Sequence, residues 1–306
     1  MQRTELSVLS SDGFHDLKGV VYEPDVRPKG LMHIVHGMAE HIGRYEEFMK
    51  RICADGWLVF GFDNLGHGFT ARSDSELGFI AKKDGWKLLI KDVQLFRNGV
   101  VKKYGISYPY VLMGHSMGSF IVRHAAVSNE KPDKLIFMGT GGPNPAAGPA
   151  HSISKMISGM KGAERPSPML EKLMFNGYND RFKDEPDADE YSWLSTLKST
   201  RVKYLSDKYC GFRFSSSALC DLLKLVEHTG SKKLISATGR TIPILIVSGA
   251  EDPVGNYGQG PAKVAEMYKN CGADVTLKIY PGVRHEILND TSREEVIKDI
   301  LEFIDK

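Results

Sequence analysis

The chain has 306 residues, of which 42% are hydrophobic and 25% are charged, and its formal net charge is +2. This length suits one large α/β domain with an insertion or two small domains, and the composition is ordinary for a globular protein. No block of basic residues indicates nucleic-acid binding, and no run is apolar and long enough to span a bilayer.

The N-terminus and the cysteines bear on where the protein resides. The opening residues, MQRTELSVLSSDGFHD, lack the apolar stretch of a signal peptide. The four cysteines show neither the CxxC spacing nor the spacing of a metal knuckle, and they are Cys53, Cys210, Cys220 and Cys271. We therefore expect a soluble cytoplasmic protein with reduced thiols and without a metal site or organic cofactor.

Short apolar runs alternate with helical patterns along the chain. Eight runs predict strands, in chain order Glu5–Leu9, Leu17–Tyr22, Gly30–Gly37, Gly56–Asp63, Tyr108–Gly114, Lys134–Gly139, Ile242–Gly249 and Asp274–Gly282. Apolar residues three or four apart predict helices near Tyr45–Ile52 and over Gly85–Tyr104, Met117–Ser128, Pro261–Cys271 and Ser292–Ile304. This alternation predicts a mostly parallel eight-stranded sheet with helices on both faces.

The alternation breaks in the middle of the chain. The Gly/Pro-rich stretch GTGGPNPAAGP leaves the last of the early strands, and ATGRTIP leads back to the next strand. Between them lie helical patches without a clear buried strand. We predict a core formed by residues 1–143 and 240–306, with residues 144–239 inserted as a helical cap over the carboxyl edge of the sheet.

A serine flanked by glycines follows the strand YVLMG. Ser116 stands in Gly114-His115-Ser116-Met117-Gly118, directly before a predicted helix. A sharp strand-to-helix turn crowds its neighbours, and glycines two before and two after relieve the crowding. The pattern alone is weak evidence, because a turn serine gives the same match, but the strand before it and the helix after it favour a nucleophile.

A serine hydroxyl needs a base, and the base needs an acid to orient it. Asp252 and His285 follow the last two predicted strands, so both should lie at the same sheet edge as Ser116. Glu251 competes with Asp252, and we prefer Asp252 because a sharp Pro253 turn follows it. Five other histidines fit packing, elbow, helix or cap positions better, and they are His33, His115, His124, His151 and His228.

An oxyanion formed by attack on a carbonyl needs two backbone N–H donors. Met117, directly after the nucleophile, should supply one donor. Met38, which follows the strand-end pair His36-Gly37, should supply the other, although it could also be an ordinary loop residue.

Five motifs in order resemble the monoglyceride lipase and lysophospholipase branch of the α/β-hydrolases, which is related to serine aminopeptidases. They are HGMAEHIGRY, DNLGHG, GHSMGS, GAEDPVG and GVRHE. The resemblance implies an α/β-hydrolase fold, Ser116, Asp252 and His285 as the triad, and Met38 and Met117 as oxyanion donors. It also implies that Glu40, His41 and Arg44 brace the oxyanion loop, and that Asp63 and His67 are structural.

The predicted cap carries two apolar clusters at helical spacing. Flexible methionine side chains suit a groove for varied acyl chains, although they could simply pack the cap on the core. The candidate substrate contacts are Met156, Met160, Met174 and Cys210. Lys155 and Lys161 beside the apolar stripe could favour transient contact with an anionic membrane surface, but a solvated helix face explains them as well.

These features together predict a carboxylic ester hydrolase that acts on monoacylglycerol or lysophospholipid-type esters through an acyl-enzyme on Ser116. An aminopeptidase or amidase with the same triad is an alternative, for which the acidic run from Asp184 to Glu190 would bind a peptide amine. That run also reads as a solvated loop. A non-catalytic ligand receptor of the same fold is a further alternative. The oligomeric state has no signature in the sequence.

Overall fold

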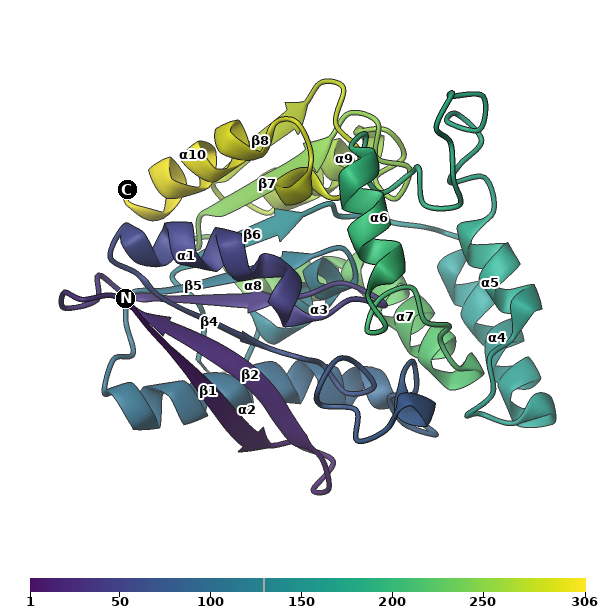
Figure 1. Cartoon of the computed structure of the whole chain (residues 1–306), viewed down its shortest axis with the longest axis horizontal. Helices are drawn as coiled ribbons and strands as arrows, with labels where there is room; N and C mark the ends of the chain where they lie inside the picture. Colours follow the sequence, from purple (N-terminus) through teal and green to yellow (C-terminus); the bar gives the residue numbers. More distant parts are fainter. Residues whose placement is uncertain (129) are drawn as a thin grey trace.

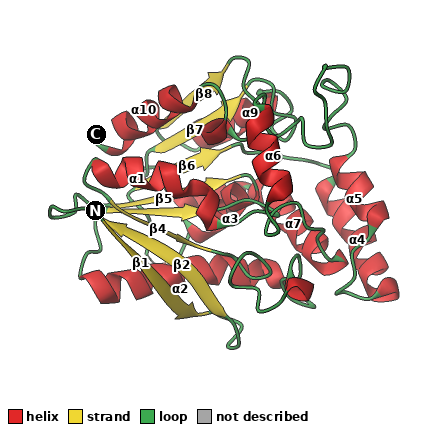
Figure 2. Cartoon of the chain, viewed as in Figure 1, coloured by secondary structure: helices red, strands yellow, loops and turns green. Residues whose placement is uncertain are grey.

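The structure is a computed structural model that describes residues 1–128 and 130–306, with the side chains of residues 160 and 161 outside the description. Its centre is one eight-stranded sheet in the order β1-β2-β4-β3-β5-β6-β7-β8 (Figure 2). The strands are β1 (Gln2–Leu9), β2 (Asp16–Glu23), β3 (Leu31–Val35), β4 (Leu58–Phe62), β5 (Tyr110–His115), β6 (Lys134–Met138), β7 (Ile244–Gly249) and β8 (Val275–Tyr280). The strands β1 and β2 pair antiparallel with their neighbours, and β3 to β8 run parallel, which confirms the predicted fold class.

Helices cover both faces of the sheet because alternate side chains of each buried strand point to opposite faces. In β3, Met32 and Ile34 pack with the apolar sides of α1 (Glu46–Ala54) and α10 (Arg293–Ile304). Leu31 and Val35 point the other way, into a second core cluster. That cluster is shared with α2 (Gly85–Tyr104), α3 (Met117–Ala125) and α9 (Gln259–Asn270).

Five helices lie in the chain between β6 and β7. They are α4 (Ala147–Lys161), α5 (Pro168–Phe175), α6 (Lys198–Ser206), α7 (Ser216–Thr229) and α8 (Lys232–Thr238). Figure 1 shows α4 to α7 gathered at the end of the sheet toward which the parallel strands point, opposite the two termini. The side chains of Ser215 and Ser231 cap α7 and α8, and Pro168 begins α5, so each of these helices has a favourable start.

The acidic run of this inserted segment is a solvated loop only in part. Arg201 is fully buried on α6 and donates to Asp187 and Asp189 at 2.8 Å each. The buried Arg284 forms an ion pair with Glu185 and donates to the Ser192 carbonyl at 2.8 Å. The interpretation as a solvated loop fits Asp184 and Glu190, which are exposed, but it misses the role of Glu185, Asp187 and Asp189, because two buried guanidinium groups need their oxygens as partners.

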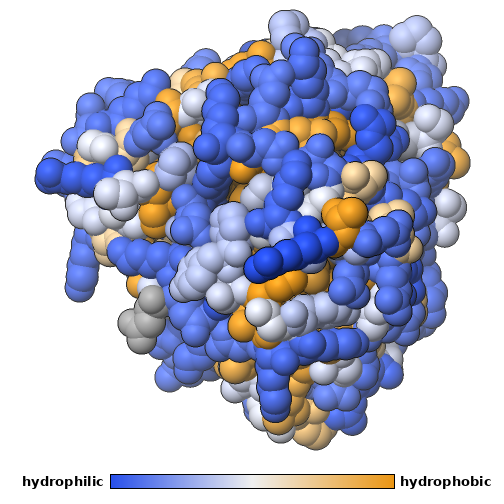
Figure 3. Space-filling model, turned by 90° about the vertical axis from the view of Figure 1, so that its left-hand side faces the viewer, coloured by the Kyte–Doolittle hydropathy of each residue, from blue (hydrophilic) through white to orange (hydrophobic). Residues whose placement is uncertain are grey.

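The molecular surface differs between the two ends of the sheet. The end seen in Figure 3, on the left of Figure 1, is mainly hydrophilic, with apolar side chains in small interrupted areas. At the opposite end, α4 and α5 expose four large apolar side chains, namely Ile153, Met156, Met169 and Leu173. None of the helices in the described ranges combines the length and the apolar character needed to cross a bilayer.

Candidate active site

Ser116 occupies a strained turn between β5 and α3. Its φ of 52° and ψ of −121° lie where residues other than glycine are rarely found. A Cβ on Gly114 would lie 2.3 Å from the Gly118 carbonyl oxygen, and a Cβ on Gly118 would lie 2.1 Å from the Val35 oxygen. Close backbone contacts thus require glycine at both positions, as the Gly-x-Ser-x-Gly pattern predicted for a sharp turn.

His285 and Asp252 meet beyond the ends of β8 and β7. His285 Nδ1 lies 2.9 Å from Asp252 Oδ2, and both side chains are buried. The other oxygen of Asp252 accepts from the Val254 amide at 2.9 Å, so the carboxylate is fixed on both sides. Because Nδ1–H donates to a carboxylate, Nε2 is left as the basic atom of the ring.

Glu251, the competing acid, lies apart from this pair. Its side chain is half-exposed, and its nearest cation is Arg284, whose Nε is 3.7 Å from Glu251 Oε2. The geometry therefore pairs His285 with Asp252 and not with the preceding carboxylate.

Two rings hold the imidazole of His285 in place. The His115 ring lies 4.8 Å from it and the Trp193 ring 5.2 Å from it, measured between ring centroids. Trp193 belongs to the segment between α5 and α6, and the Glu286 amide next to His285 donates to the Leu194 carbonyl at 2.8 Å. The sequence analysis missed Trp193, because an isolated tryptophan in an irregular segment has no periodic signal.

Ser116 and His285 line one cavity of about 870 Å³ between the sheet edge and the inserted helices. Met38 and Met117 line it beside Ser116, and Met174 lines it from α5. Its apolar wall continues with Phe120, Phe175, Leu222, Leu223, Val226 and Val254. The arrangement can therefore hold a largely apolar ligand against a serine hydroxyl.

Two of the predicted substrate contacts, Met156 and Cys210, are not part of this wall, and the side chain of Met160 lies outside the described residues. Met156 is 61% exposed on α4. Cys210 is buried with Leu194 and Tyr204, which line the cavity together with Gly211, while Cys210 itself does not. Helical spacing predicted an apolar stripe but could not show which side of α4 faces the core.

Met38 and Met117, the predicted oxyanion donors, both line the cavity beside Ser116. Neither of their backbone amides donates a hydrogen bond within residues 1–128 and 130–306. The flanking amides are engaged, since Gly37 N donates to Glu40 Oε1 at 2.6 Å and Ala39 N to His67 Nε2 at 3.3 Å. Ala39 has a φ of 52°, so this loop is a second strained turn beside the strained serine.

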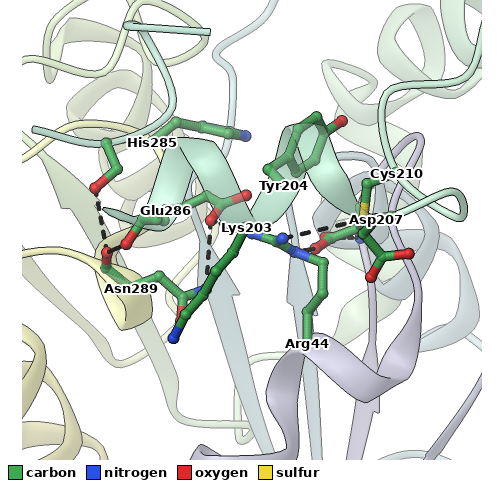
Figure 4. A network of polar contacts seen from close by, with 12 residues as sticks. Arg44, Lys203, Tyr204, Asp207, Cys210, His285, Glu286 and Asn289 are labelled. Carbon is green, nitrogen blue, oxygen red and sulfur yellow. Dashed lines mark hydrogen bonds and ion pairs between the residues drawn. The ribbon is translucent and has the colours of Figure 1, made fainter. Parts of the chain in front are cut away.

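A buried ionic network around Arg44, part of which is drawn in Figure 4, adjoins the loop that carries Met38. Arg44 extends between Glu286 and Cys210, pairing with Glu286 and, at 3.3 Å, with Glu40. Glu40 also accepts from the Tyr45 hydroxyl at 2.8 Å and contacts His115 Nδ1 at 3.2 Å. The network links the loop of Met38, the turn at Ser116 and the residue after His285.

This network sets the charge state of its members. Burial alone would lower the pKa of His115, but the hydrogen bond to the Glu40 carboxylate raises it above the ordinary value. Burial opposes ionisation of Glu40, yet its contact with His115 and the charge of Arg44 hold the pKa of its carboxyl well below the usual range. Glu40 is therefore an anion that orders the loop.

Asp63 and His67, which were expected to be structural, form hydrogen bonds to the backbone of the strand-end loops. Both oxygens of Asp63 accept backbone amides at 2.8 Å, from Ile42 and Phe69. Burial lowers the pKa of His67 to about 3, so its neutral ring can accept the Ala39 amide. These contacts fix the strand-end loops against each other.

One group of potential metal ligands lies at this junction. His41, Asp207 and Cys210 offer three atoms within 4.8 Å of one another. However, His41 Nε2 and Asp207 Oδ2 bond each other at 2.8 Å, and the Arg44 guanidinium lies 4.0 Å from the Cys210 sulfur. Burial also raises the pKa of this thiol to about 12, which disfavours the thiolate that a metal needs. The group is explained as a contact between the loop and the inserted segment.

Comparison with known proteins places the chain in a family. The family model for serine aminopeptidase, S33, matches residues 26–292. The chain belongs to this S33 family. Together with the relatives described next, this match confirms the resemblance to the monoglyceride lipase branch of the α/β-hydrolases that five motifs predicted.

Individual relatives of this S33 chain cover nearly its whole length. Monoacylglycerol lipase of Mycolicibacterium smegmatis is 27% identical, over 97% of this chain and 98% of the relative. Human monoglyceride lipase is 26% identical over 86% of this chain and 78% of the relative. The crystal structure of a thermostable carboxyl esterase from Bacillus coagulans in complex with glycerol superposes with a TM-score of 0.89 at 31% identity. The superposition covers 100% of this chain and 98% of that one.

Proposed function

We propose that the protein is a serine hydrolase of carboxylic esters, with monoacylglycerols or lysophospholipids as its main substrates. One observation carries the proposal, namely that the bonded pair of Asp252 and His285 opens on the same apolar cavity as the strained Ser116. The relatives are named monoacylglycerol lipase and carboxyl esterase, which supports an ester as the substrate.

Acylation begins with the proton of Ser116. His285 Nε2 takes this proton while the Ser116 oxygen attacks the ester carbonyl carbon. The carbonyl π electrons move to oxygen, and the Met38 and Met117 amides donate to the resulting oxyanion. The tetrahedral intermediate collapses, the alcohol leaves with the proton held by His285, and the acyl group remains on Ser116.

Deacylation repeats the sequence with water. His285 removes a proton from water, whose oxygen attacks the acyl-enzyme carbonyl and forms a second oxyanion at the same amides. The collapse breaks the bond to Ser116 and returns the proton to it. Asp252 keeps the imidazole in the Nδ1–H tautomer and stabilises its charged form in both halves.

The cavity supports a substrate with an acyl chain. Its apolar wall is built from Met174 on α5 and from Leu222, Leu223 and Val226 on α7. We propose that residues 144–239 act as a cap domain that supplies this wall, with residues 1–143 and 240–306 as the catalytic core. Of the substrate contacts predicted from sequence, Met174 is the one that we retain.

The test uses a short p-nitrophenyl ester, a long-chain monoacylglycerol and a fluorophosphonate probe. The wild-type protein should hydrolyse both esters and be labelled, and Ser116→Ala should lose turnover and labelling together. Circular dichroism of Ser116→Ala against the wild type checks that the variant folds. Retention of turnover and labelling by Ser116→Ala would overturn the assignment of the nucleophile.

A second candidate is hydrolysis of an amide by the same residues. The family description favours it, and Glu171 and Glu190 line the cavity, where a substrate amine could pair with them. Of the other acids suggested for this role, Asp187 and Asp189 pair with Arg201, and Glu185 pairs with Arg284. A panel that pairs p-nitrophenyl esters with aminoacyl p-nitroanilides decides between the candidates, and faster turnover of an anilide would replace the ester proposal.

We further propose that the cap contacts a lipid surface and that the protein is cytoplasmic. Ile153 and Met156 are exposed on α4, Met169 is exposed on α5, and Leu173 is both exposed and part of the cavity wall. A lipid could thus pass from a membrane into the cavity along apolar side chains. The four cysteines are free in the structure, which supports a reducing compartment.

A further inference from the structure

A buried arginine without an acidic partner lies behind the nucleophile. Arg123 on α3 is 1% exposed, and no carboxylate in the described part of the chain forms an ion pair with it. Its guanidinium lies 5.1 Å from the ring centre of Phe137 and 5.6 Å from that of Phe120, so cation–π contacts offset part of the cost of burying the charge. A charge that is costly to bury calls for a structural or functional reason.

The arginine heads a chain of hydrogen bonds that ends at Ser116. Arg123 Nη2 donates to Thr140 Oγ1, and the hydroxyls of Thr140 and Ser119 lie 2.7 Å apart. Ser119 Oγ lies 2.6 Å from the Ser116 carbonyl oxygen. Because the guanidinium can only donate and the carbonyl can only accept, the direction is fixed along the whole chain. Arg123 donates to Thr140, Thr140 to Ser119, and Ser119 to the Ser116 carbonyl.

The end of this chain controls the peptide between Ser116 and Met117. The Ser116 carbonyl also accepts from Ser119 N at 2.9 Å, so the amide and the hydroxyl of Ser119 together hold it toward α3. The peptide unit is planar and trans, and its N–H therefore points opposite to its C=O. Holding the carbonyl of Ser116 thus aims the Met117 amide, which lies at the cavity wall and donates to no described group.

We propose that Arg123, Thr140 and Ser119 are positioning residues that aim the Met117 amide at the oxyanion. The proposal rests on the proposed function of Ser116 and extends it to three residues that touch no substrate. Thr140 stands just beyond β6, and its neighbour Gly139 packs against His285, since a Cβ on Gly139 would lie 3.2 Å from His285 Cε1. The same loop therefore contacts both the nucleophile turn and the base.

The test replaces Thr140 with valine, which keeps the shape and removes the hydroxyl. We expect kcat for a p-nitrophenyl ester to fall about 10- to 100-fold with KM within about twofold, because one oxyanion donor is misaimed and not lost. The inhibition constant of a trifluoromethyl ketone, whose adduct with Ser116 carries an oxyanion, should rise in parallel. The dissociation constant of a non-hydrolysable ether analogue should stay unchanged. Thr140→Ser, which restores the hydroxyl, should return all three values to those of the wild type.

Two outcomes would overturn the proposal. One is a folded Thr140→Val with wild-type kcat and ketone inhibition, and the other is an equal loss of ether-analogue binding, which indicates a general distortion of the cavity. If Thr140→Val does not fold, Ser119→Ala removes the next hydroxyl with a smaller change and carries the same expectations. Turnover by Ser116→Ala would instead remove the proposed function itself, so the two failures are distinguishable.

Discussion

His285 Nδ1 lies 2.9 Å from Asp252 Oδ2, although the two residues follow different strands, β8 and β7. We predict that Asp252→Asn lowers kcat by about 10³- to 10⁴-fold, because an amide no longer stabilises the imidazolium or its useful tautomer. Steady-state kinetics with a p-nitrophenyl ester measures this loss. Glu251→Gln is the matched control and should keep wild-type kcat, and the reverse pattern would transfer the role to Glu251.

The Arg44 network should contribute stability through its burial. Arg44→Met leaves the buried carboxylates of Glu40 and Glu286 without their cation, and we expect the free energy of unfolding to fall by about 3–5 kcal/mol. Arg51 pairs with Glu294 at 3.1 Å in an exposed site, so Arg51→Met should cost less than about 1 kcal/mol. Urea unfolding of both variants checks this, and equal losses would refute the special role of burial.

Asp221 gives stability a dependence on pH. Burial raises the pKa of this carboxyl from 3.8 to about 7, so the native state holds a proton that the unfolded chain has released between pH 3.8 and about 7. The native state therefore binds more protons in that window, and stability falls as the pH rises through it.

Asp221→Asn cannot ionise. We accordingly predict that the difference in the free energy of unfolding, Asp221→Asn minus wild type, rises by about 2–3 kcal/mol when the pH is raised from about 5 to about 8. Urea unfolding of both proteins at the two pH values measures the change. Asp74→Asn, at an exposed site, should show no such trend. A constant difference between wild type and Asp221→Asn across this range would contradict the prediction.

Val226 lines the cavity from α7 and should limit the acyl chain. Val226→Phe adds volume to the wall, so we expect kcat/KM for a long-chain monoacylglycerol to fall about tenfold, with little change for an acetate ester. A chain-length series from acetate to palmitate measures the shift. Val26→Phe, at an exposed position of the core, should leave the profile as in the wild type. An unchanged profile in Val226→Phe would place the acyl chain elsewhere.

The exposed apolar residues of α4 and α5 should govern binding to lipid. We expect Met156→Asp combined with Met169→Asp to lower partitioning onto anionic phosphatidylglycerol vesicles by about 10- to 100-fold, because burial of both thioethers in the interface is lost. Vesicle co-sedimentation measures it, with Val26→Asp as the control for one added charge at a distant exposed position. Equal partitioning of all proteins would show that this surface does not dock.

The positions of the strands, helices and motifs could be predicted from the sequence, because they depend on the spacing of apolar residues and on glycines within short segments. The helix Gly85–Tyr104 was predicted with the bounds that it has, since apolar residues repeat along it and Gly105 ends it with a φ of 70°. Ser116, Asp252 and His285 could be named because parallel strands bring their carboxyl ends to one edge of a sheet. Because each of these residues follows a parallel strand, its place in the chain is enough to predict that it lies near the other two.

Other features depended on the tertiary structure alone. Whether Met156 or Met174 faces the cavity depends on how α4 and α5 rotate against α7, and apolar spacing is the same for an outward and an inward stripe. Trp193 beside His285, and Arg123 behind Ser116, make contacts between segments whose separation along the chain carries no periodic signal. Local propensity determined the elements of this protein, and the packing of distant segments decided which side chains surround the reacting serine.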